Sequence, residues 1–163
     1  NHINKLGDYE TILGGQTSGG KGIFLMNTYD DSISRKSLRY NTTENKVNTK
    51  NTYFKEDVVV TLRDNIFTFA SDSGTQSFTV GNTSSFNSNY SLWIFALNNG
   101  GSLFGGALMK LYYLKIWDNG VLIRDYIPVK NVLNDNKICL YDKVENKFYY
   151  NAGSGEFIAG GVA

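Results

Sequence analysis

Short runs of alternating polar and apolar residues, separated by turn residues, recur along most of this chain. The clearest are residues 58–63 and 67–70, in which every second side chain is aliphatic or aromatic. Because successive side chains of a strand point to opposite faces of a sheet, this spacing predicts two β-strands. Asp64 and Asn65, which lie between the two runs, predict a two-residue hairpin turn.

The same pattern extends over the first two thirds of the chain. Further strands are predicted at residues 9–13, 22–27, 36–40, 78–80 and 90–97. Residues 41–52, rich in Asn and Thr, predict a loop or an edge hairpin. Residues 104–109 contain two adjacent glycines and predict no more than one helical turn. Strands recurring at roughly 8 to 12 residues indicate a sandwich or a barrel rather than βαβ units.

Two hairpins are predicted in the last third of the chain. Residues 110–117 and 121–127 are rich in aromatic and β-branched residues, and between them stand Asn119 and Gly120. Both of these residues accept the positive φ that a tight turn demands. Residues 138–150 predict a second hairpin around a polar turn.

The sequence of this region resembles that of a known family. The segments that carry the resemblance are, in order, LWIFALNNGG, KLYYLKIWDNG, RDYIPV and LYDKVENKFYYNAGSGEF. From about Tyr90 onward, the chain resembles the concanavalin A-like, laminin-G-like jelly-roll modules. Such modules are common in tail and minor structural proteins of phages and prophages, and in surface proteins of Gram-positive gut bacteria. The resemblance implies an all-β, two-sheet antiparallel jelly-roll sandwich with an extracellular location, on a virion tail or a bacterial cell surface.

The composition fits this fold class. A chain of 163 residues with 41% hydrophobic content suits one domain with its own core. Seventeen glycines against one proline, with 14% aromatic residues, indicate many turns in an all-β protein. Because the chain begins at Asn1 without a methionine, we expect a single laminin-G-like jelly-roll domain, 1–163, that is a segment of a longer polypeptide or a processed product.

Charge and hydropathy exclude some partners. The chain has 16 Lys and Arg against 15 Asp and Glu, which gives no strong field to attract nucleic acid or anionic lipid. It contains no apolar run of the roughly 18 to 20 residues that span a bilayer, so we expect no membrane insertion. Cys139, the single cysteine, lies in an apolar strand pattern and predicts a buried structural thiol.

The sequence does not predict an enzyme. A glycan hydrolase of this fold needs two carboxylates on one strand face, about 5 to 10 Å apart. The glutamates stand at Glu10, Glu44, Glu56, Glu145 and Glu156. None has an alternating acidic partner within a predicted strand, and the adjacent residues Glu56 and Asp57 would point to opposite faces. The only histidine, His2, stands near the beginning of the chain and supports no catalytic set.

Calcium is the one cofactor for which the sequence offers a candidate. Asp30 and Asp31 are adjacent carboxylates that could join backbone carbonyls around this ion. A solvated acidic turn explains the same pair, and we favour that reading. No cluster of Cys and His indicates another metal.

Sugar binding uses residue types in which this chain is rich. An aromatic ring packs under the apolar face of a pyranose, while planar amides and carboxylates bond its paired hydroxyls. The candidate ligand-binding residues at predicted strand ends are Tyr29, Asp30, Arg39, Tyr40, Tyr53, Asn98, Asn99 and Trp117. Each also has a structural explanation, since tyrosines cap sandwich cores and Asn-Gly pairs make turns.

The sequence also predicts the environment of two tryptophans and of one pair of adjacent charged residues. Trp93, within an apolar run, is expected in the core, whereas Trp117 is expected to face outward. The adjacent residues Arg124 and Asp125 should pair with groups on neighbouring strands rather than with each other.

From the resemblance and the candidate binding residues, we expect a non-catalytic module that binds a cell-surface glycan or a host receptor. The alternative is a structural or protein-interaction module that contacts other tail or surface protein subunits.

Overall fold

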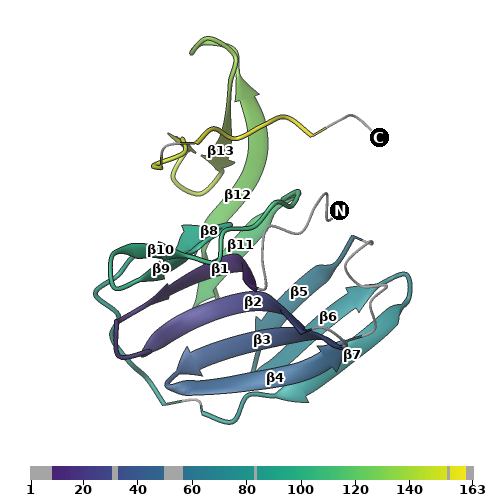
Figure 1. Ribbon diagram of the computed structural model, residues 1–163. Coiled ribbons are helices and arrows are strands. Elements are labelled where there is room, and N and C mark those ends of the chain that lie inside the picture. The colour runs from purple at the N-terminus through teal and green to yellow at the C-terminus, as the bar shows by residue number, and fades with distance from the viewer. Residues whose placement is uncertain (1–8, 31–32, 50–56, 83, 154, 161–163) are drawn as a thin grey trace. The chain divides into compact units, whose positions relative to one another are not determined.

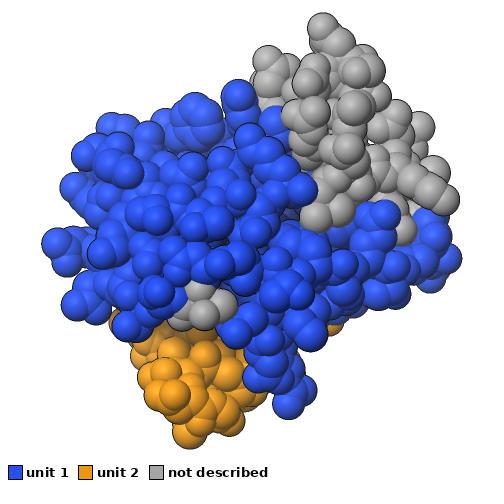
Figure 2. Space-filling model, turned by 90° about the horizontal axis from the view of Figure 1, so that it is seen from below, with its two compact units in different colours: residues 1–109 blue, residues 110–163 orange. Residues whose placement is uncertain are grey.

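The structure, a computed structural model, describes residues 9–30, 33–49, 57–82, 84–153 and 155–160, and it is all-β (Figure 1). Within these ranges there is no helix, in agreement with the sequence pattern. The chain divides into two compact units, 1–109 and 110–163, which Figure 2 distinguishes by colour. The single-domain expectation stays a prediction.

The strands follow one another closely in both units. Unit 1 contains β1 (Tyr9–Gln16), β2 (Gly22–Asp30), β3 (Ile33–Asn41), β4 (Thr43–Thr49), β5 (Val59–Arg63), β6 (Ile66–Ser71), β7 (Gly74–Thr79), β8 (Trp93–Ile94), β9 (Leu97–Asn99) and β10 (Ser102–Phe104). Unit 2 contains β11 (Leu114–Asp118), β12 (Val121–Asn131), β13 (Lys137–Asp142) and β14 (Lys147–Tyr149).

Unit 1 consists of two sheets packed face to face. The larger sheet has the order β10-β9-β1-β2-β3-β4 with β8 added to β1, and the smaller sheet has the order β5-β6-β7. Leu25 and Leu38 of the larger sheet share one buried cluster with Phe67 and Phe69 of the smaller sheet. In Figure 1, β5 to β7 lie behind β2 to β4. Burial of these apolar side chains is the main force that holds the two layers together.

Residues with positive φ form the turns of two hairpins in unit 1. Asp64 and Asn65 join β5 to β6 with φ values of 48° and 64°, which confirms the predicted two-residue turn. For residues 41–52, the sequence left a loop or an edge hairpin open, and the described part, 41–49, forms the edge hairpin. Its strand β4 pairs with β3 in antiparallel register. Residues 50–52 lie outside the described ranges. The hairpin turns at Asn41, which has a φ of 59°.

The predicted strand at residues 90–97 is wrong in extent. Only Trp93–Ile94 and Leu97–Asn99 are strands, and Phe95 between them has a φ of 64°. The chain reverses at this residue, so β8 pairs with β1 in antiparallel fashion while β9 pairs with it in parallel. Trp93 is half-buried rather than enclosed in the core.

Two glycines near the end of β1 are part of the strand. Gly14 and Gly15 lie inside β1 and are buried. A Cβ atom on Gly14 would stand 2.7 Å from both Leu97 Cδ1 and Phe24 Cβ. These glycines therefore let neighbouring strands approach β1 closely.

Unit 2 is one antiparallel sheet in the order β11-β12-β13-β14. Both predicted hairpins are confirmed, the first with φ values of 47° at Asn119 and 81° at Gly120. The first strand is shorter than the predicted run, since β11 begins at Leu114. Trp117 is exposed and Cys139 is buried, both as expected.

Candidate ligand-binding site

Two of the predicted site residues, Arg39 and Asn99, meet at one end of the larger sheet of unit 1. They are joined through Gln16, which donates from Nε2 to Asn99 Oδ1 at 3.1 Å and accepts from Arg39 Nη1 at 3.3 Å. Arg39 Nη2 in turn lies 3.2 Å from Glu44 Oε2. We call these four side chains, Gln16, Arg39, Glu44 and Asn99, the rim network.

Strand register assembles the rim network. Arg39 of β3 stands opposite Phe24 of β2 and opposite Glu44 of β4. Gln16 of β1 stands opposite Asn99 of β9. Directly paired residues project from the same face of a sheet, so the register places Arg39 beside Glu44 and Gln16 beside Asn99. The ends of β1, β3 and β9 and the beginning of β4 thus contribute to one site at the left end of the larger sheet in Figure 1.

The Arg39 guanidinium is held on several sides. It lies 5.1 Å from the centre of the buried Phe24 ring, a cation–π contact. Its Nη1 also donates to the carbonyl oxygen of Gly20 at 2.9 Å. Gly20 has a φ of 80°, and a Cβ atom there would stand 2.5 Å from this nitrogen. Arg39 therefore has a fixed orientation that depends on a bare glycine.

Part of the rim network is open to solvent. The side chains of Arg39 and Glu44 are 21% and 24% exposed. Lys46 approaches the other carboxylate oxygen of Glu44 at 3.5 Å. Arg39 Nε is buried and has no hydrogen-bond partner among the described residues. The network thus presents a guanidinium and a carboxylate side by side in a fixed arrangement.

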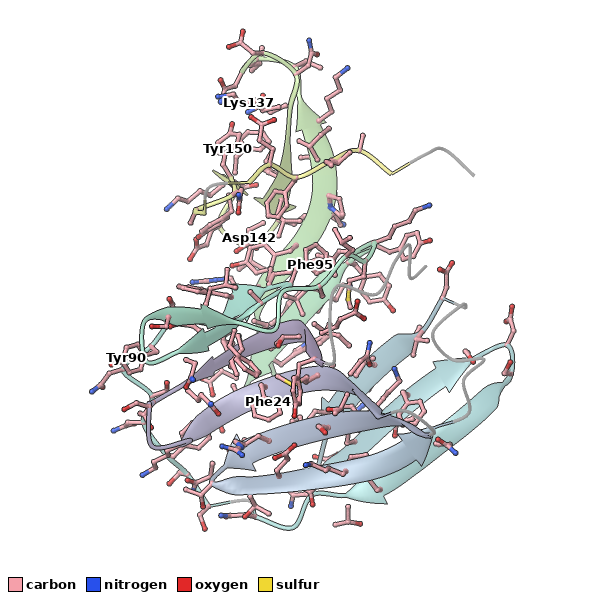
Figure 3. The ribbon with its side chains drawn as sticks, viewed as in Figure 1. Phe24, Tyr90, Phe95, Lys137, Asp142 and Tyr150 are labelled. Carbon is pink, nitrogen blue, oxygen red and sulfur yellow. The ribbon has the colours of Figure 1, made fainter. Side chains whose placement is uncertain are left out.

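An exposed aromatic ring, Tyr90, lies at the same end of the sheet. A Cβ atom on Gly101, two residues after Asn99, would stand 3.9 Å from Tyr90 Cε1. The turn before Gly101 is tied to β1, because Gly100 N donates to the Gln16 carbonyl oxygen at 2.9 Å. Figure 3 labels Tyr90 at the left edge of the view and Phe24 on β2. A ring and a set of planar polar groups therefore share this rim.

Asn98 and Tyr40 occupy structural positions. Asn98 is buried, donates to the Ser91 carbonyl oxygen at 3.1 Å and accepts from Gly101 N at 2.9 Å, so it fixes the turn after β9. Tyr40, next to Arg39, faces the other side of the sheet, where it packs on the core and meets the Phe86 ring edge-on at 5.2 Å.

The other predicted site residues fall elsewhere. Trp117 belongs to unit 2. Tyr29 and Asp30 lie on β2, but their side chains are outside the described part of the structure, as are Asp31 and Tyr53 altogether. The two calcium candidates, Asp30 and Asp31, are therefore not placed as ligands. In the ranges that the structure covers, no group of three or more His, Cys, Asp and Glu side chains gathers to hold a metal ion.

A polar cluster in unit 2 joins β12, β13 and the turn that follows β13. Arg124 Nη1 lies 2.7 Å from Glu145 Oε1, and its Nε lies 3.6 Å from Asp142 Oδ2. Asp142 Oδ1 accepts from the backbone N–H groups of Asp125 and Val144 at 3.0 Å each. Burial would raise the pKa of Asp142, but these hydrogen bonds and the Arg124 charge outweigh it and lower that pKa.

The neighbouring residue Asp125 has separate partners. Its Oδ2 lies 3.8 Å from Lys115 Nζ and 3.9 Å from Lys143 Nζ. Arg124 and Asp125 therefore pair with groups on neighbouring segments, as the sequence predicts. The short distances and the burial of Asp142 indicate a structural cluster.

Unit 2 also has an apolar surface hollow of about 300 Å³. Its lining residues are Val129, Lys130, Asn131, Val132, Leu133, Tyr141 and Phe148. The rings of Tyr141 and Phe148 lie 5.1 Å apart, and Leu133 is 93% exposed. Apolar surface of this kind is a feature of protein contact sites.

Sequence reasoning missed Gln16, Glu44 and Tyr90. Glu44 had a local signal, since a two-residue turn at Asn41 and Thr42 places it opposite Arg39. Gln16 had none, because Asn99, its partner, is 83 residues away. Tyr90 falls within the predicted strand at residues 90–97, but it lies before β8 and outside any strand.

Comparison of the chain with protein-family models, with curated proteins and with solved structures found no match in any of the three. The resemblance to laminin-G-like modules therefore stays a prediction. No helix in the described ranges is long and apolar enough to cross a membrane.

Proposed function

We propose that this chain is a non-catalytic carbohydrate-binding module whose ligand contacts the rim network and Tyr90. The observation that carries the proposal is the continuous hydrogen-bonded series from Asn99 through Gln16 and Arg39 to Glu44. Amide, guanidinium and carboxylate groups are planar and suit the paired hydroxyl groups of a sugar. An exposed tyrosine ring suits its apolar face.

The fixed geometry of the rim supports binding. Arg39 is held by the Phe24 ring, the Gly20 carbonyl oxygen and Glu44 before any ligand arrives. A group that is already ordered loses less conformational entropy when it binds, so more of the contact energy appears as affinity. Single contacts of this type are weak, and display of several copies on one particle would raise the overall affinity.

The proposed setting follows the family resemblance. Unit 1, with two face-to-face sheets, supports the proposal of a concanavalin A-like jelly-roll sandwich. In such a setting, the chain is borne on a phage or prophage tail protein or on a bacterial surface protein, and it binds a cell-surface glycan or a glycosylated host receptor.

A polysaccharide-binding assay with a multimerised form of the full chain tests this function. We expect retention on at least one cell-wall or capsular polysaccharide. Arg39→Lys keeps the charge but removes the planar fork, and Tyr90→Ala removes the ring, so each should weaken retention at least about tenfold. Arg63→Lys is the matched control, because Arg63 is largely exposed and forms an ion pair with the equally exposed Asp64.

The proposal fails if the multimerised chain is retained on no polysaccharide. It also fails if Arg39→Lys and Tyr90→Ala bind as well as Arg63→Lys. In the second case, a glycan site exists but lies outside the rim.

A second candidate function is a structural or protein-interaction module that contacts other tail or surface subunits. The apolar hollow of unit 2, whose lining includes the exposed Leu133, favours this candidate. Analytical ultracentrifugation would then detect an assembly that Leu133→Asp disrupts and Arg39→Lys leaves intact. An unchanged monomer in both variants and in the parent chain would count against it.

A further inference from the structure

Three polar side chains form a buried row on the inner face of the larger sheet. Glu10 of β1 stands opposite Asn27 of β2, and Asn27 stands opposite Lys36 of β3. Directly opposite residues have Cβ atoms about 4.5–5.5 Å apart on one face of a sheet. The exposed fractions of Glu10, Asn27 and Lys36 are 0%, 5% and 2%. The row is thus closed off from solvent.

The row faces the smaller sheet of unit 1. Leu25 and Leu38 lie two residues from Asn27 and Lys36 along their strands and belong to the core cluster shared with the smaller sheet. Side chains two residues apart on a strand share a face. In agreement, the Lys36 ammonium group lies 5.5 Å from the centre of the Phe69 ring.

Lys36 and Asn27 are in direct contact. Lys36 Nζ donates to Asn27 Oδ1 at 3.0 Å. A carbonyl bond is about 1.2 Å long, so Nζ lies no more than about 4.2 Å from the carbonyl carbon Cγ. Reacting atoms in near-attack geometries are about 3–3.5 Å apart. A small rotation of the lysine side chain therefore brings its nitrogen to the distance at which an amine attacks a carboxamide.

Burial favours the nucleophilic form of the amine. Desolvation lowers the pKa of Lys36 to about 8. At pH 8 about half of such amines are neutral, compared with well under one per cent for an ordinary lysine. The neutral amine carries the free electron pair that nucleophilic attack requires.

We propose that Lys36 and Asn27 become joined by an intramolecular isopeptide bond, with Glu10 carrying the proton. Nζ of the neutral amine attacks Asn27 Cγ and forms the new C–N bond. The Glu10 carboxylate takes a proton from the attacking nitrogen and passes it to Asn27 Nδ2. The Cγ–Nδ2 bond then breaks, ammonia leaves, and Glu10 returns to its starting charge.

The reaction balances without any other reactant, because an amine and a primary amide become a secondary amide and ammonia. The apolar surroundings support it in two ways. They exclude the water that would compete with the amine, and they strengthen the interaction of Glu10 with the charge that develops on nitrogen. The product also buries an uncharged amide in place of a costly ammonium group.

Intact mass spectrometry of the purified full chain tests the proposal. We expect a mass below that of the sequence by one ammonia molecule, with a proteolytic fragment in which the peptides of Asn27 and Lys36 are linked. Trypsin should fail to cleave after Lys36. A chain with the full sequence mass, and with free Asn27 and Lys36 peptides, would overturn the proposal.

Two variants separate the roles. Lys36→Arg keeps a positive charge and a donor for Asn27 but cannot form the bond, so it should have the full sequence mass. Glu10→Gln should remain unlinked, or link at least about tenfold more slowly, while circular dichroism reports a folded β-protein. Linkage at the parent rate in Glu10→Gln would overturn the assignment of the proton carrier. If Lys36→Arg does not fold, the linked fragment of the parent chain decides alone.

An unrelated loss of ammonia must be distinguished. Asn99-Gly100 and Asn119-Gly120 are sequences in which asparagine can cyclise to a succinimide with the same change of mass. A succinimide would persist in Lys36→Arg and would open in mild base. The isopeptide bond would be absent from that variant and stable in base in the parent chain.

Discussion

The Arg39 guanidinium lies over the ring of Phe24, 5.1 Å from its centre, at the end of the larger sheet. Phe24 is buried and also belongs to a small apolar cluster with Met26 and Leu97. The ring therefore connects the interior of unit 1 with the polar rim. A cation over an aromatic face at a partly desolvated site contributes about 1 kcal/mol of stability. The same contact also helps to orient the Arg39 guanidinium.

Replacement of Arg39 by methionine should destabilise unit 1. The variant Arg39→Met keeps much of the packing on Phe24 but removes the hydrogen bonds to Gln16, Gly20 and Glu44. We expect the free energy of unfolding to fall by about 1–2 kcal/mol, because partly buried acceptors lose their donor. Urea denaturation followed by tryptophan fluorescence measures this. Arg63→Met, at an exposed pair, should change it by less than about 0.5 kcal/mol.

A methyl group at Gly20 should displace Arg39. In Gly20→Ala, the new Cβ would stand 2.5 Å from Arg39 Nη1, at a residue with a φ of 80°. We expect a loss of about 1–2 kcal/mol of stability from backbone strain, together with loss of glycan retention. Gly19→Ala is the control, since among the described residues beyond its chain neighbours the nearest atom to its Cβ would be Thr17 Oγ1, at 3.7 Å. Equal behaviour of both variants would contradict the role given to Gly20.

Local turn signals explain why much of the fold was predictable. Asp64 with Asn65, and Asn119 with Gly120, adopt positive φ values where the sequence places hairpins. The positions of these turns follow from the conformational preferences of a few residues. The pairing of adjacent strands around each turn then follows without information from distant parts of the chain.

Contacts between distant segments were not predictable from the pattern. The apolar run at residues 90–97 reads as one strand, yet Phe95 reverses the chain so that β8 and β9 both pair with β1. The contact of Gln16 with Asn99 depends on that parallel pairing. Alternation of side chains fixes which face a residue occupies, but not which strand becomes its neighbour.

Acid should weaken unit 2 through Asp142. Its pKa in the folded chain is lowered, because hydrogen bonds from Asp125 N and Val144 N and the charge of Arg124 outweigh the effect of burial. The unfolded chain therefore binds this proton more readily. The stabilisation is present above the unfolded pKa of 3.8 and is lost as the pH falls through the lower folded pKa.

Urea denaturation at several pH values between about 2 and 7 measures this dependence. Asp142→Asn should be less stable at pH 7, because a neutral amide lacks the charge that attracts Arg124 and has one oxygen acceptor where the carboxylate has two. It should also lose less stability on acidification. Asp135→Asn, in the exposed turn before β13, should follow the parent curve. Parallel curves for the parent and Asp142→Asn would contradict this account.

Cys139 should resist thiol reagents in the folded chain. It is fully buried in β13, and burial raises the pKa of its thiol despite a backbone hydrogen bond at Asn131 that acts in the opposite direction. Both effects of burial lower reactivity, because the thiolate is the reactive species and the reagent cannot reach it. At pH 8, we expect labelling by iodoacetamide at least about a hundredfold slower than in denaturant, where the thiol behaves as a free cysteine.

The rate of Cys139 labelling should rise with urea concentration in parallel with unfolding of β13, so the reaction also reports on the stability of unit 2. Asp142→Asn should therefore accelerate labelling at a given urea concentration, while Asp135→Asn should not. Labelling of the native parent chain at the rate of a free thiol would show that β13 is open to solvent, and would contradict the burial on which the role of Asp142 depends.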